Sequence, residues 1–400
     1  MREKLVLFGA GNIGRSFIGQ LFARSGYEVV FVDIDSGLVG ALNREGRYRV
    51  VIKRNDERDE VMWVEGVRAV NASDGQAVGA EIATASIAAT AVGAAALRAI
   101  APLIARSIER RFTSADAPML DIIIAENIRE GAGVLRAEVE KHLPESSRAL
   151  LDRVGLVETS IGKMVPIMTR ADRAVDPLWV FAEEYNTLIV DGRAFRGAPP
   201  SIQGLDVVDN ISAYVDRKLY IHNLGHAAVA YLGNRRMERA VYLWEALENE
   251  SVSREARRAM EQSAAALSRA YPREFPPGTL LPHIDDLLRR FANRALADTI
   301  FRVGRDLYRK LGRNERLIGA ALLAARHGVP FDAIALVIAN AVQFRAADEE
   351  GKPFPDDRRF TEEELPRGMA GILERVCGLR PSEEPDRQVY DDLLLRAARL

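Results

Sequence analysis

One stretch near the start of this sequence restricts the fold more than any other. An apolar run typical of a buried strand, Leu5-Val6-Leu7-Phe8, is followed at once by the glycine pattern Gly9-Ala10-Gly11-Asn12-Ile13-Gly14. Helical periodicity comes next, and a second apolar run ends on Asp33, 19 residues after Gly14. A strand, G-x-G-x-x-G, a helix and a second strand ending in an acid at this distance are typical of a βαβ unit that binds a dinucleotide.

Each part of the glycine pattern has a physical role in this binding. Gly9 makes the tight turn, Gly11 lets the backbone approach a pyrophosphate, and Gly14 permits close packing of helix against strand. The N–H groups at the start of the helix bind phosphate oxygens. The other candidate cofactor contacts of the turn are Ala10, Asn12 and Ile13.

The acid at the end of the second strand indicates which dinucleotide binds. We expect Asp33 to accept hydrogen bonds from both ribose hydroxyls. The next residues, Ile34 and Asp35, include no arginine that could receive a 2′-phosphate. NAD is therefore favoured over NADP.

The pattern along the chain predicts two domains of different class. In the first half, apolar runs alternate with helical stretches, and a charged turn at 54–60 joins the two strands of a hairpin. We predict an α/β fold: a Rossmann-type doubly wound sheet with added strands at 1–195, then a mostly α-helical domain at 196–400. The boundary falls in the Gly/Pro-rich stretch 192–200. Further strands are expected within 47–52, 61–64, 86–93, 120–125, 155–166 and 178–191.

In the second half, helical periodicity dominates from residue 210 to 347. Breaks are expected at Pro272, at 276–278 and at 328–330, where proline and glycine interrupt the pattern. The charged, proline-containing stretch 346–367 predicts a surface loop, and two short helices are expected to close the chain.

Ligands of doubly wound sheets gather at the carboxyl ends of the strands, which makes residues there further candidates. Thr90 and Val92 lie at the small end of one strand, where ribose and nicotinamide would pass. Asn127 follows the next strand, where its carboxamide could meet nicotinamide or substrate. It could equally be the N-cap of a helix beginning near Arg129.

The second half contains a lysine, an asparagine and a histidine within nine residues of one expected helix. At roughly 100° per residue, Lys218, His226 and Asn223 project at roughly 0°, 80° and 140°, so all three can face one cavity. A proton-transfer group, a carboxamide donor and an orienting imidazole would then meet. Alternatively, Lys218 is a surface lysine, Asn223 faces water and His226 is a core histidine. The angles alone do not exclude His222 in place of His226.

Composition narrows the classes of function. The chain has 400 residues and a net charge of −2, so it shows no basic excess of the kind that nucleic-acid binding requires. No apolar run approaches the ~18 residues of a membrane span, and no signal peptide is visible, so we expect a soluble, cytoplasmic protein. One cysteine and five histidines without zinc-ligand spacing predict no metal site.

Several motifs together resemble the polyol-specific long-chain dehydrogenases of the mannitol dehydrogenase family, and the resemblance covers nearly the whole chain. These motifs are GAGNIGRSFIG at 9–19, TAVG at 90–93, AEN at 125–127, RKLYIHNLGHAAVAYLG at 217–233 and RVGRDLYRKL at 302–311. The resemblance implies an NAD-dependent, metal-free interconversion of D-mannitol 1-phosphate and D-fructose 6-phosphate. It also implies a small-molecule sugar or polyol phosphate as the partner, and a monomer.

The same resemblance assigns roles to the candidate residues. Its K-x4-N-x2-H signature selects His226, which orients the lysine or the substrate. Lys218 becomes the general base in oxidation, and Asn223 and Asn127 polarise the reacting oxygen. Chemistry agrees with the first role, because oxidising a secondary alcohol needs a proton acceptor, and burial can lower a lysine pKa towards neutrality.

A phosphorylated substrate also needs cations. The candidates are Arg302, Arg305, Arg309 and Lys310, of which the three arginines are spaced as one helix stripe. The competing interpretation is a solvated charged face, since such stripes are common on helices.

Two other functions stay open. One is a dehydrogenase of an unphosphorylated polyol, like mannitol 2-dehydrogenase, or a hexuronate reductase. The other is an NAD-binding regulator without turnover, which the retained lysine, asparagine and histidine disfavour, because a sensor needs no proton acceptor.

Overall fold

The structure is a computed structural model that describes residues 2–55, 58–166, 168, 170–237 and 239–397. The chain divides into two compact units, Met1–Ile211 and Ser212–Leu400. Within the described ranges, no helix combines the length and apolar character that a bilayer crossing requires.

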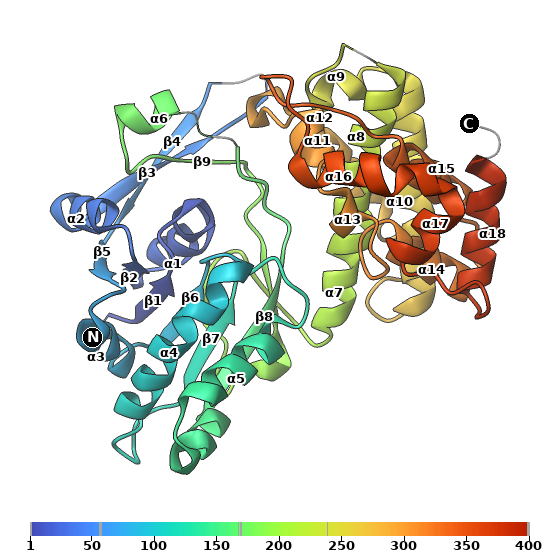
Figure 1. Ribbon diagram of the computed structural model, residues 1–400. Coiled ribbons are helices and arrows are strands. Elements are labelled where there is room, and N and C mark those ends of the chain that lie inside the picture. Colours follow the sequence, from blue (N-terminus) through green and yellow to red (C-terminus); the bar gives the residue numbers. More distant parts are fainter. Residues whose placement is uncertain (1, 56–57, 167, 169, 238, 398–400) are drawn as a thin grey trace. The chain divides into compact units, whose positions relative to one another are not determined.

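The first unit is built on an eight-stranded sheet (Figure 1). Six parallel strands lie in the order β5-β2-β1-β6-β7-β8, the strand order of a dinucleotide-binding doubly wound sheet. β10 adds to β8 in the antiparallel direction, and β11 pairs with β10 at that edge. The predicted fold class is confirmed. The strands are β1 Lys4–Phe8, β2 Glu28–Asp33, β5 Val67–Asn71, β6 Ile87–Thr90, β7 Leu120–Ile124, β8 Val154–Ile161, β10 Leu188–Asp191 and β11 Leu205–Val208.

Helices cover both faces of this sheet, which is why its central strands are apolar throughout rather than alternating. On β1, Leu5 and Leu7 pack with the first helix, whereas Val6 and Phe8 pack with α3, α4 and α5. Successive strand residues thus enter two separate cores. The helices of this unit are α1 Gln20–Arg24, α2 Ser36–Glu45, α3 Gly75–Ala83, α4 Ala94–Arg111, α5 Gly131–His142 and α6 Arg170–Val175.

A second, three-stranded sheet lies beside the first helix. The predicted hairpin is present as β3 Arg47–Ile52 and β4 Glu60–Glu65, and β9 Val180–Ala182 adds to β3. The expectation that all of 178–191 extends the main sheet is therefore wrong for β9. An apolar run specifies a strand, but distant packing decides its partner. Asp56 and Glu57 of the hairpin turn lie outside the described residues.

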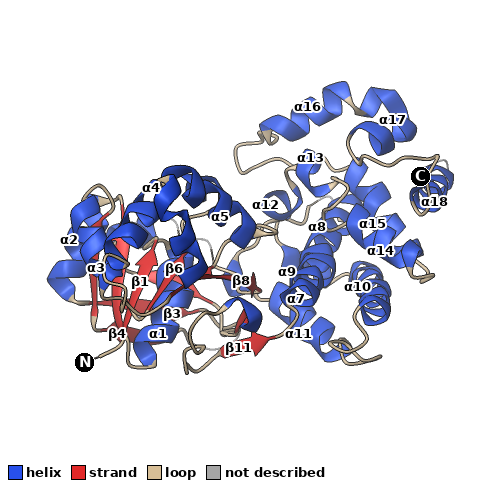
Figure 2. Ribbon diagram, turned by 90° about the horizontal axis from the view of Figure 1, so that it is seen from below, coloured by secondary structure: helices blue, strands red, loops and turns tan. Residues whose placement is uncertain are grey.

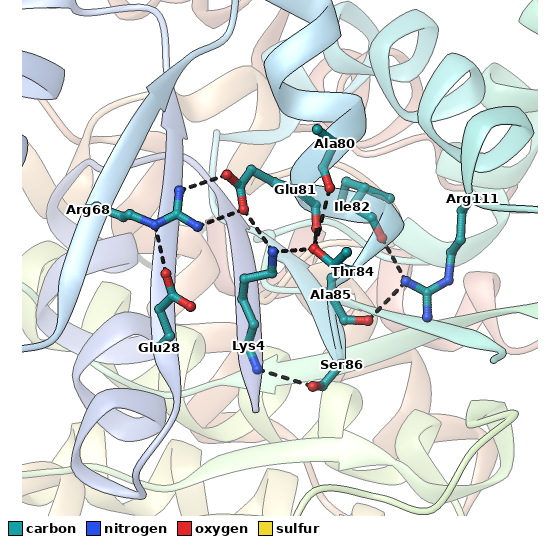
Figure 3. A network of polar contacts seen from close by, with 10 residues as sticks. All are labelled: Lys4, Glu28, Arg68, Ala80, Glu81, Ile82, Thr84, Ala85, Ser86 and Arg111. Atoms are coloured by element: carbon teal, nitrogen blue, oxygen red, sulfur yellow. Dashed lines mark hydrogen bonds and ion pairs between the residues drawn. The ribbon is translucent and has the colours of Figure 1, made fainter. Parts of the chain in front are cut away.

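An ion-pair network ties the amino ends of the main strands together (Figure 3). Glu81 on α3 accepts hydrogen bonds from Lys4 at 2.8 Å and from both terminal nitrogens of Arg68 at 2.7 Å. Arg68 also pairs with Glu28 at 2.7 Å. Hydrogen bonds from Arg68 and Lys4 outweigh the effect of burial and lower the pKa of Glu81 to about 2. Since ligands bind at the opposite ends of parallel strands, this network serves stability.

In the second unit the regular elements of the described residues are helices (Figure 2). The central helix α8 is buried from Leu224 to Gly233 except at His226. A Cβ atom on Gly225 would collide with the side chain of Met260 on α10, so glycine here lets the two helices pack closely. The helices are α7 Ile211–Arg217, α8 Leu224–Arg236, α9 Leu243–Leu247, α10 Glu250–Ala270, α11 Leu281–Phe291, α12 Ile300–Gly304, α13 Leu307–Lys310, α14 Ile318–Arg326, α15 Asp332–Val342, α16 Pro355–Glu363, α17 Gly368–Arg375 and α18 Asp386–Ala397.

Two sequence-based expectations for this unit have different outcomes. The predicted breaks are confirmed, since α10 ends before Pro272, α11 begins after the 276–278 run and α15 begins after Pro330. The predicted surface loop at 346–367 is wrong, because it contains α16. Pro355 at the first helical position and acidic residues in the first turn are start signals for this helix.

Candidate active site

The glycine turn of the first unit has the backbone that a dinucleotide needs. Gly9 has φ +99°, and a Cβ atom on it would collide with the carbonyl of Ala91. A Cβ atom on Gly14 would collide with the carbonyl of Gly9. Gly11, in contrast, has no atom within 4 Å of a Cβ position, and it is exposed. The protein's own packing requires Gly9 and Gly14, whereas Gly11 leaves its backbone open to a ligand.

Asp33 is held beside this turn by two backbone groups. Its carboxylate accepts hydrogen bonds from the N–H of Ala10 at 2.7 Å and of Asp35 at 3.0 Å. A carboxylate has about four acceptor positions, so it retains capacity for ribose hydroxyls. Helical structure begins at Asn12, which directs the first N–H groups towards the turn. These residues fit NAD.

Two loops at the carboxyl ends of β6 and β7 are joined by a residue that the sequence did not single out. The buried carboxylate of Glu126 accepts hydrogen bonds from the N–H of Val92 at 2.9 Å and of Gly93 at 2.8 Å. Burial raises the pKa of Glu126, although these hydrogen bonds oppose the shift. Thr90 is buried and Asn127 is exposed. Asn127 is not a helix N-cap, because α5 begins at Gly131 with Glu130 as its N-cap.

The first helix contains a π-helical turn, Gly14–Gly19, which the added hairpin stabilises. A π-turn inserts one residue into the helical hydrogen-bond ladder and calls for other donors to its carbonyls. The hydroxyl of Tyr48 on β3 donates to the carbonyl of Arg15 at 2.7 Å. Arg15 is itself buried, and its Nε donates to the carbonyl of Ala10 at 2.7 Å. The small sheet therefore supports the glycine turn through Arg15.

A second π-turn, Lys218–Asn223, lies in the second unit, within a helical stretch that runs continuously from Ile211 to Arg236. In a π-turn, residue i+5 lies where residue i+4 lies in an α-helix. Lys218 and Asn223 are five residues apart, and His226 follows three residues later. The π-turn therefore brings Lys218 and Asn223 closer to one line than the roughly 140° separation of an uninterrupted α-helix.

Burial singles out the same three residues. Between Lys218 and Gly233, only Lys218, Asn223 and His226 are half-buried, and every other residue is buried. A lysine that lies on an exposed helix face would not show this pattern. His222 is one of the buried residues, and burial lowers its pKa well below the usual value.

The surroundings of Lys218 favour a neutral amine. Burial lowers the pKa of Lys218 to about 8, and the cations Arg316 and Arg309 add to this effect. Glu315 opposes it. An amine with this pKa can exchange a proton near neutral pH.

The ring of His226 is fixed by two contacts. It stacks on Phe291 of α11, with 4.8 Å between the ring centroids and 23° between the planes. Its Nε2 lies 3.0 Å from Oδ2 of Asp298, a buried residue that also pairs with Arg302. Asp298 lies 72 residues from His226 along the chain, so no local signal in the sequence indicated it.

The candidate phosphate residues do not form the single helix stripe that their spacing predicted. The helix is interrupted at Arg305 and Asp306, where Asp306 has φ 76°, so Arg302 lies on α12 and Arg309 on α13. The buried carboxylate of Asp357 accepts hydrogen bonds from the N–H groups of Asp306 and Leu307 and thereby caps the start of α13.

The four cations have different surroundings. Arg305 and Arg309 are exposed, and Arg309 pairs with Asp306 at 2.5 Å. Lys310 is buried and donates to the carbonyls of Val303 and Arg305. Arg302 is half-buried beside Asp298.

Comparisons with known proteins cover both units. Residues 3–204 match the family described as the mannitol dehydrogenase Rossmann domain, and residues 210–369 match the mannitol dehydrogenase C-terminal domain. A mannitol-1-phosphate 5-dehydrogenase of Brevibacillus brevis is 37% identical over 340 residues, 85% of each chain. A protein of the same name from Geobacillus thermodenitrificans is 39% identical over 321 residues, 80% of each chain.

Two solved structures share the fold at low sequence identity. D-sorbitol dehydrogenase in a substrate-free form has a TM-score of 0.79 and 16% identity, covering 98% of this chain and 92% of its own. A ternary complex of Pseudomonas fluorescens mannitol 2-dehydrogenase has a TM-score of 0.75 and 15% identity, covering 100% of this chain and 92% of its own.

Proposed function

The chain belongs to the mannitol dehydrogenase family, and from this premise we propose that it interconverts D-mannitol 1-phosphate and D-fructose 6-phosphate. The observation that carries the proposal is that Lys218, Asn223 and His226 are the half-buried residues of an otherwise buried helical stretch, from Lys218 to Gly233. Relatives named mannitol-1-phosphate 5-dehydrogenase, 37% and 39% identical over most of the chain, support the choice of substrate.

The cofactor is NAD. We assign its binding to the turn from Gly9 to Gly14, to Asp33, and to the loop that contains Thr90 and Val92. When bound, the nicotinamide ring accepts the hydride that leaves the alcohol carbon. The fixed carboxylate of Asp33 and the open backbone at Gly11 support this assignment.

Lys218 is proposed as the general base of oxidation. Its neutral Nζ takes the proton from the reacting hydroxyl, and its ammonium form returns a proton when the ketose is reduced. Its pKa of about 8 supports both directions near neutral pH.

Asn223 and Asn127 are proposed to donate amide N–H groups to the reacting oxygen. Each contributes about 3 kcal/mol to stabilising the charge that develops on this oxygen, by analogy with other oxyanion donors. His226 orients the substrate beside them. With an amine as base and two carboxamides as donors, the reaction needs no metal ion, and a chelator should leave the rate unchanged.

The phosphate group is proposed to bind among Arg302, Arg305, Arg309 and Lys310. The exposed arginines, Arg305 and Arg309, are the more accessible members, while Lys310 supports the carbonyl ends of α12. Bidentate pairing makes arginine well suited to phosphate. Monomeric state and cytoplasmic location stay predictions.

The experiment that tests the proposal follows the near-ultraviolet absorbance of NADH. The purified protein is given mannitol 1-phosphate or free mannitol with NAD or NADP, and fructose 6-phosphate with the reduced cofactors. We expect turnover with the two phosphorylated sugars and NAD or NADH. Turnover of free mannitol without any of mannitol 1-phosphate would instead indicate an unphosphorylated polyol, and no turnover of any substrate would favour a regulator.

A further inference from the structure

The buried carboxylate of Asp298 contacts two side chains, one through each of its oxygens. One of its oxygens, Oδ2, lies 3.0 Å from Nε2 of His226, and the other, Oδ1, pairs with Arg302 four residues later. The side chain of Asp298 is only 6% exposed, compared with 17% for His226. We propose that Asp298 is a positioning residue that keeps the proton of the His226 ring on Nε2, which leaves Nδ1 as the acceptor nitrogen of the ring.

The backbone of Asp298 is fixed independently of its side chain. Its carbonyl accepts a hydrogen bond from the N–H of Leu243 at 2.9 Å. The N–H of Ile300 donates to the carbonyl of Val241 at 2.8 Å. These two bonds form a short antiparallel bridge on either side of Thr299. The carboxylate therefore starts from a rigid position.

Charge balance at Asp298 favours a neutral His226 ring. The single negative charge of Asp298 is already matched by the guanidinium of Arg302. We therefore expect His226 to be a neutral imidazole. An ionised carboxylate can only accept hydrogen bonds, so the ring must place its one N–H on Nε2. Nδ1 then has a lone pair and no proton.

Two aromatic neighbours fix the orientation of the ring. Phe291 stacks against one face at 4.8 Å. The buried ring of His222 meets it edge-on, with 6.2 Å between the centroids and 78° between the planes. A ring held in this way cannot exchange its two nitrogens without losing the bond to Asp298. An acceptor at Nδ1 suits a polyol, which offers a hydroxyl hydrogen at nearly every carbon.

The position of the proton can be measured without substrate. Histidine-selective ¹⁵N labelling and long-range ¹H–¹⁵N correlation distinguish a protonated from an unprotonated ring nitrogen, and the spectrum of His226→Gln assigns the signal among the five histidines. In the wild-type protein at neutral pH, we expect Nε2 of His226 to carry the proton and Nδ1 to be unprotonated. A proton on Nδ1, or on both nitrogens, would overturn the proposal.

Asp298→Asn should shift this equilibrium. An amide can donate as well as accept, so it permits the opposite tautomer, and we expect a mixture of the two ring forms. The turnover number should fall about 10- to 100-fold, by analogy with the partners that orient metal-binding histidines. The KM for NAD should not change, because the cofactor residues lie in the first unit.

Asp285→Asn is the matched control. Asp285 lies on α11, the helix that carries Phe291, but its carboxylate is 59% exposed and pairs with Arg257. We expect it to leave both the ring signals and the turnover number unchanged. If Asp298→Asn folds and still shows the wild-type His226 signals and turnover, Asp298 does not position the ring. The role of Nδ1 rests on the proposed function, whereas the tautomer is measured without it, so the two can fail separately.

Discussion

Replacing Lys218 by alanine is the most direct test of the proposed chemistry. Loss of a general base typically lowers the turnover number by about 10²- to 10⁴-fold, and we expect a fall in that range. The dissociation constant of NADH should stay the same, because its proposed contacts are in the first unit. The assay combines initial rates from NADH absorbance with a fluorescence titration of NADH.

The size of the effect follows from the surroundings of Lys218. Burial, with help from Arg316 and Arg309, lowers its pKa from 10.5 to about 8. At pH 7.5, roughly 0.1% of lysine side chains with the ordinary pKa would be neutral, compared with roughly a quarter at the lowered pKa. The protein thereby increases the population of usable base by about two orders of magnitude.

The sign of the pH dependence is fixed by the same shift. Oxidation uses the neutral amine, so its rate should rise as the pH increases through about 8 and become constant above it. Reduction uses the ammonium form, so its rate should fall over the same interval. The measurement is kcat/KM against pH in both directions.

Two neighbouring substitutions should move this profile in opposite directions. Glu315 raises the pKa of Lys218, so Glu315→Gln should move the midpoint to lower pH. Arg316 lowers that pKa, so Arg316→Gln should move the midpoint to higher pH. If neither substitution moves the midpoint of the pH–rate profile, or if Lys218→Ala leaves the turnover number unchanged, Lys218 is not the base.

Three further predictions concern the first unit. Gly11→Ala should fold normally, because its Cβ meets no atom within 4 Å, but it should bind NADH more weakly in a fluorescence titration. Gly9→Ala should instead lower the free energy of unfolding by at least about 1–3 kcal/mol, because Gly9 has φ +99° and its Cβ would collide with the carbonyl of Ala91. Equal losses of stability in the two variants would contradict this. Tyr48→Phe removes the donor to the Arg15 carbonyl, so the free energy of unfolding in urea should fall by about 1–3 kcal/mol and NADH should bind more weakly. Unchanged NADH binding would show that the hairpin does not support the cofactor turn. Glu81→Gln should lower the free energy of unfolding by about 2 kcal/mol at pH 7, because the Glu81 carboxylate has a lowered pKa in the folded state. That difference should be complete above about pH 4.5 and disappear as the pH falls towards 2, and a constant difference would rule out the ion pairs as its source.

Much of the fold could be predicted because the signals are local. The strand, glycine turn, helix and terminal Asp33 lie within 33 residues, and each is recognised from its neighbours in the chain. The helix breaks at Pro272 and Pro330 are equally local, since proline blocks its own hydrogen bond. The stretch 355–363 also has a helix start signal at Pro355, but its many charges are equally typical of a surface loop.

The candidate site could be predicted only in part. Lys218, Asn223 and His226 can be identified from one segment of the sequence. The π-turn at Lys218–Asn223 cannot, because helical periodicity does not reveal an inserted residue. No local pattern distinguishes Glu126 from other acidic residues that follow a strand, because its two N–H partners lie on the neighbouring loop.

Local sequence patterns identify most of the strands and helices, the position of the dinucleotide turn and the residue types that offer acid, base and hydrogen-bond chemistry. Packing between distant segments places β9 in the small sheet, brings the Asp357 carboxylate to the start of α13 and places Asp298 beside His226. The physical reason is distance along the chain. Local geometry is set by residues a few positions apart, whereas the partner of a strand or of a buried charge is chosen by packing between segments that the sequence alone does not bring together.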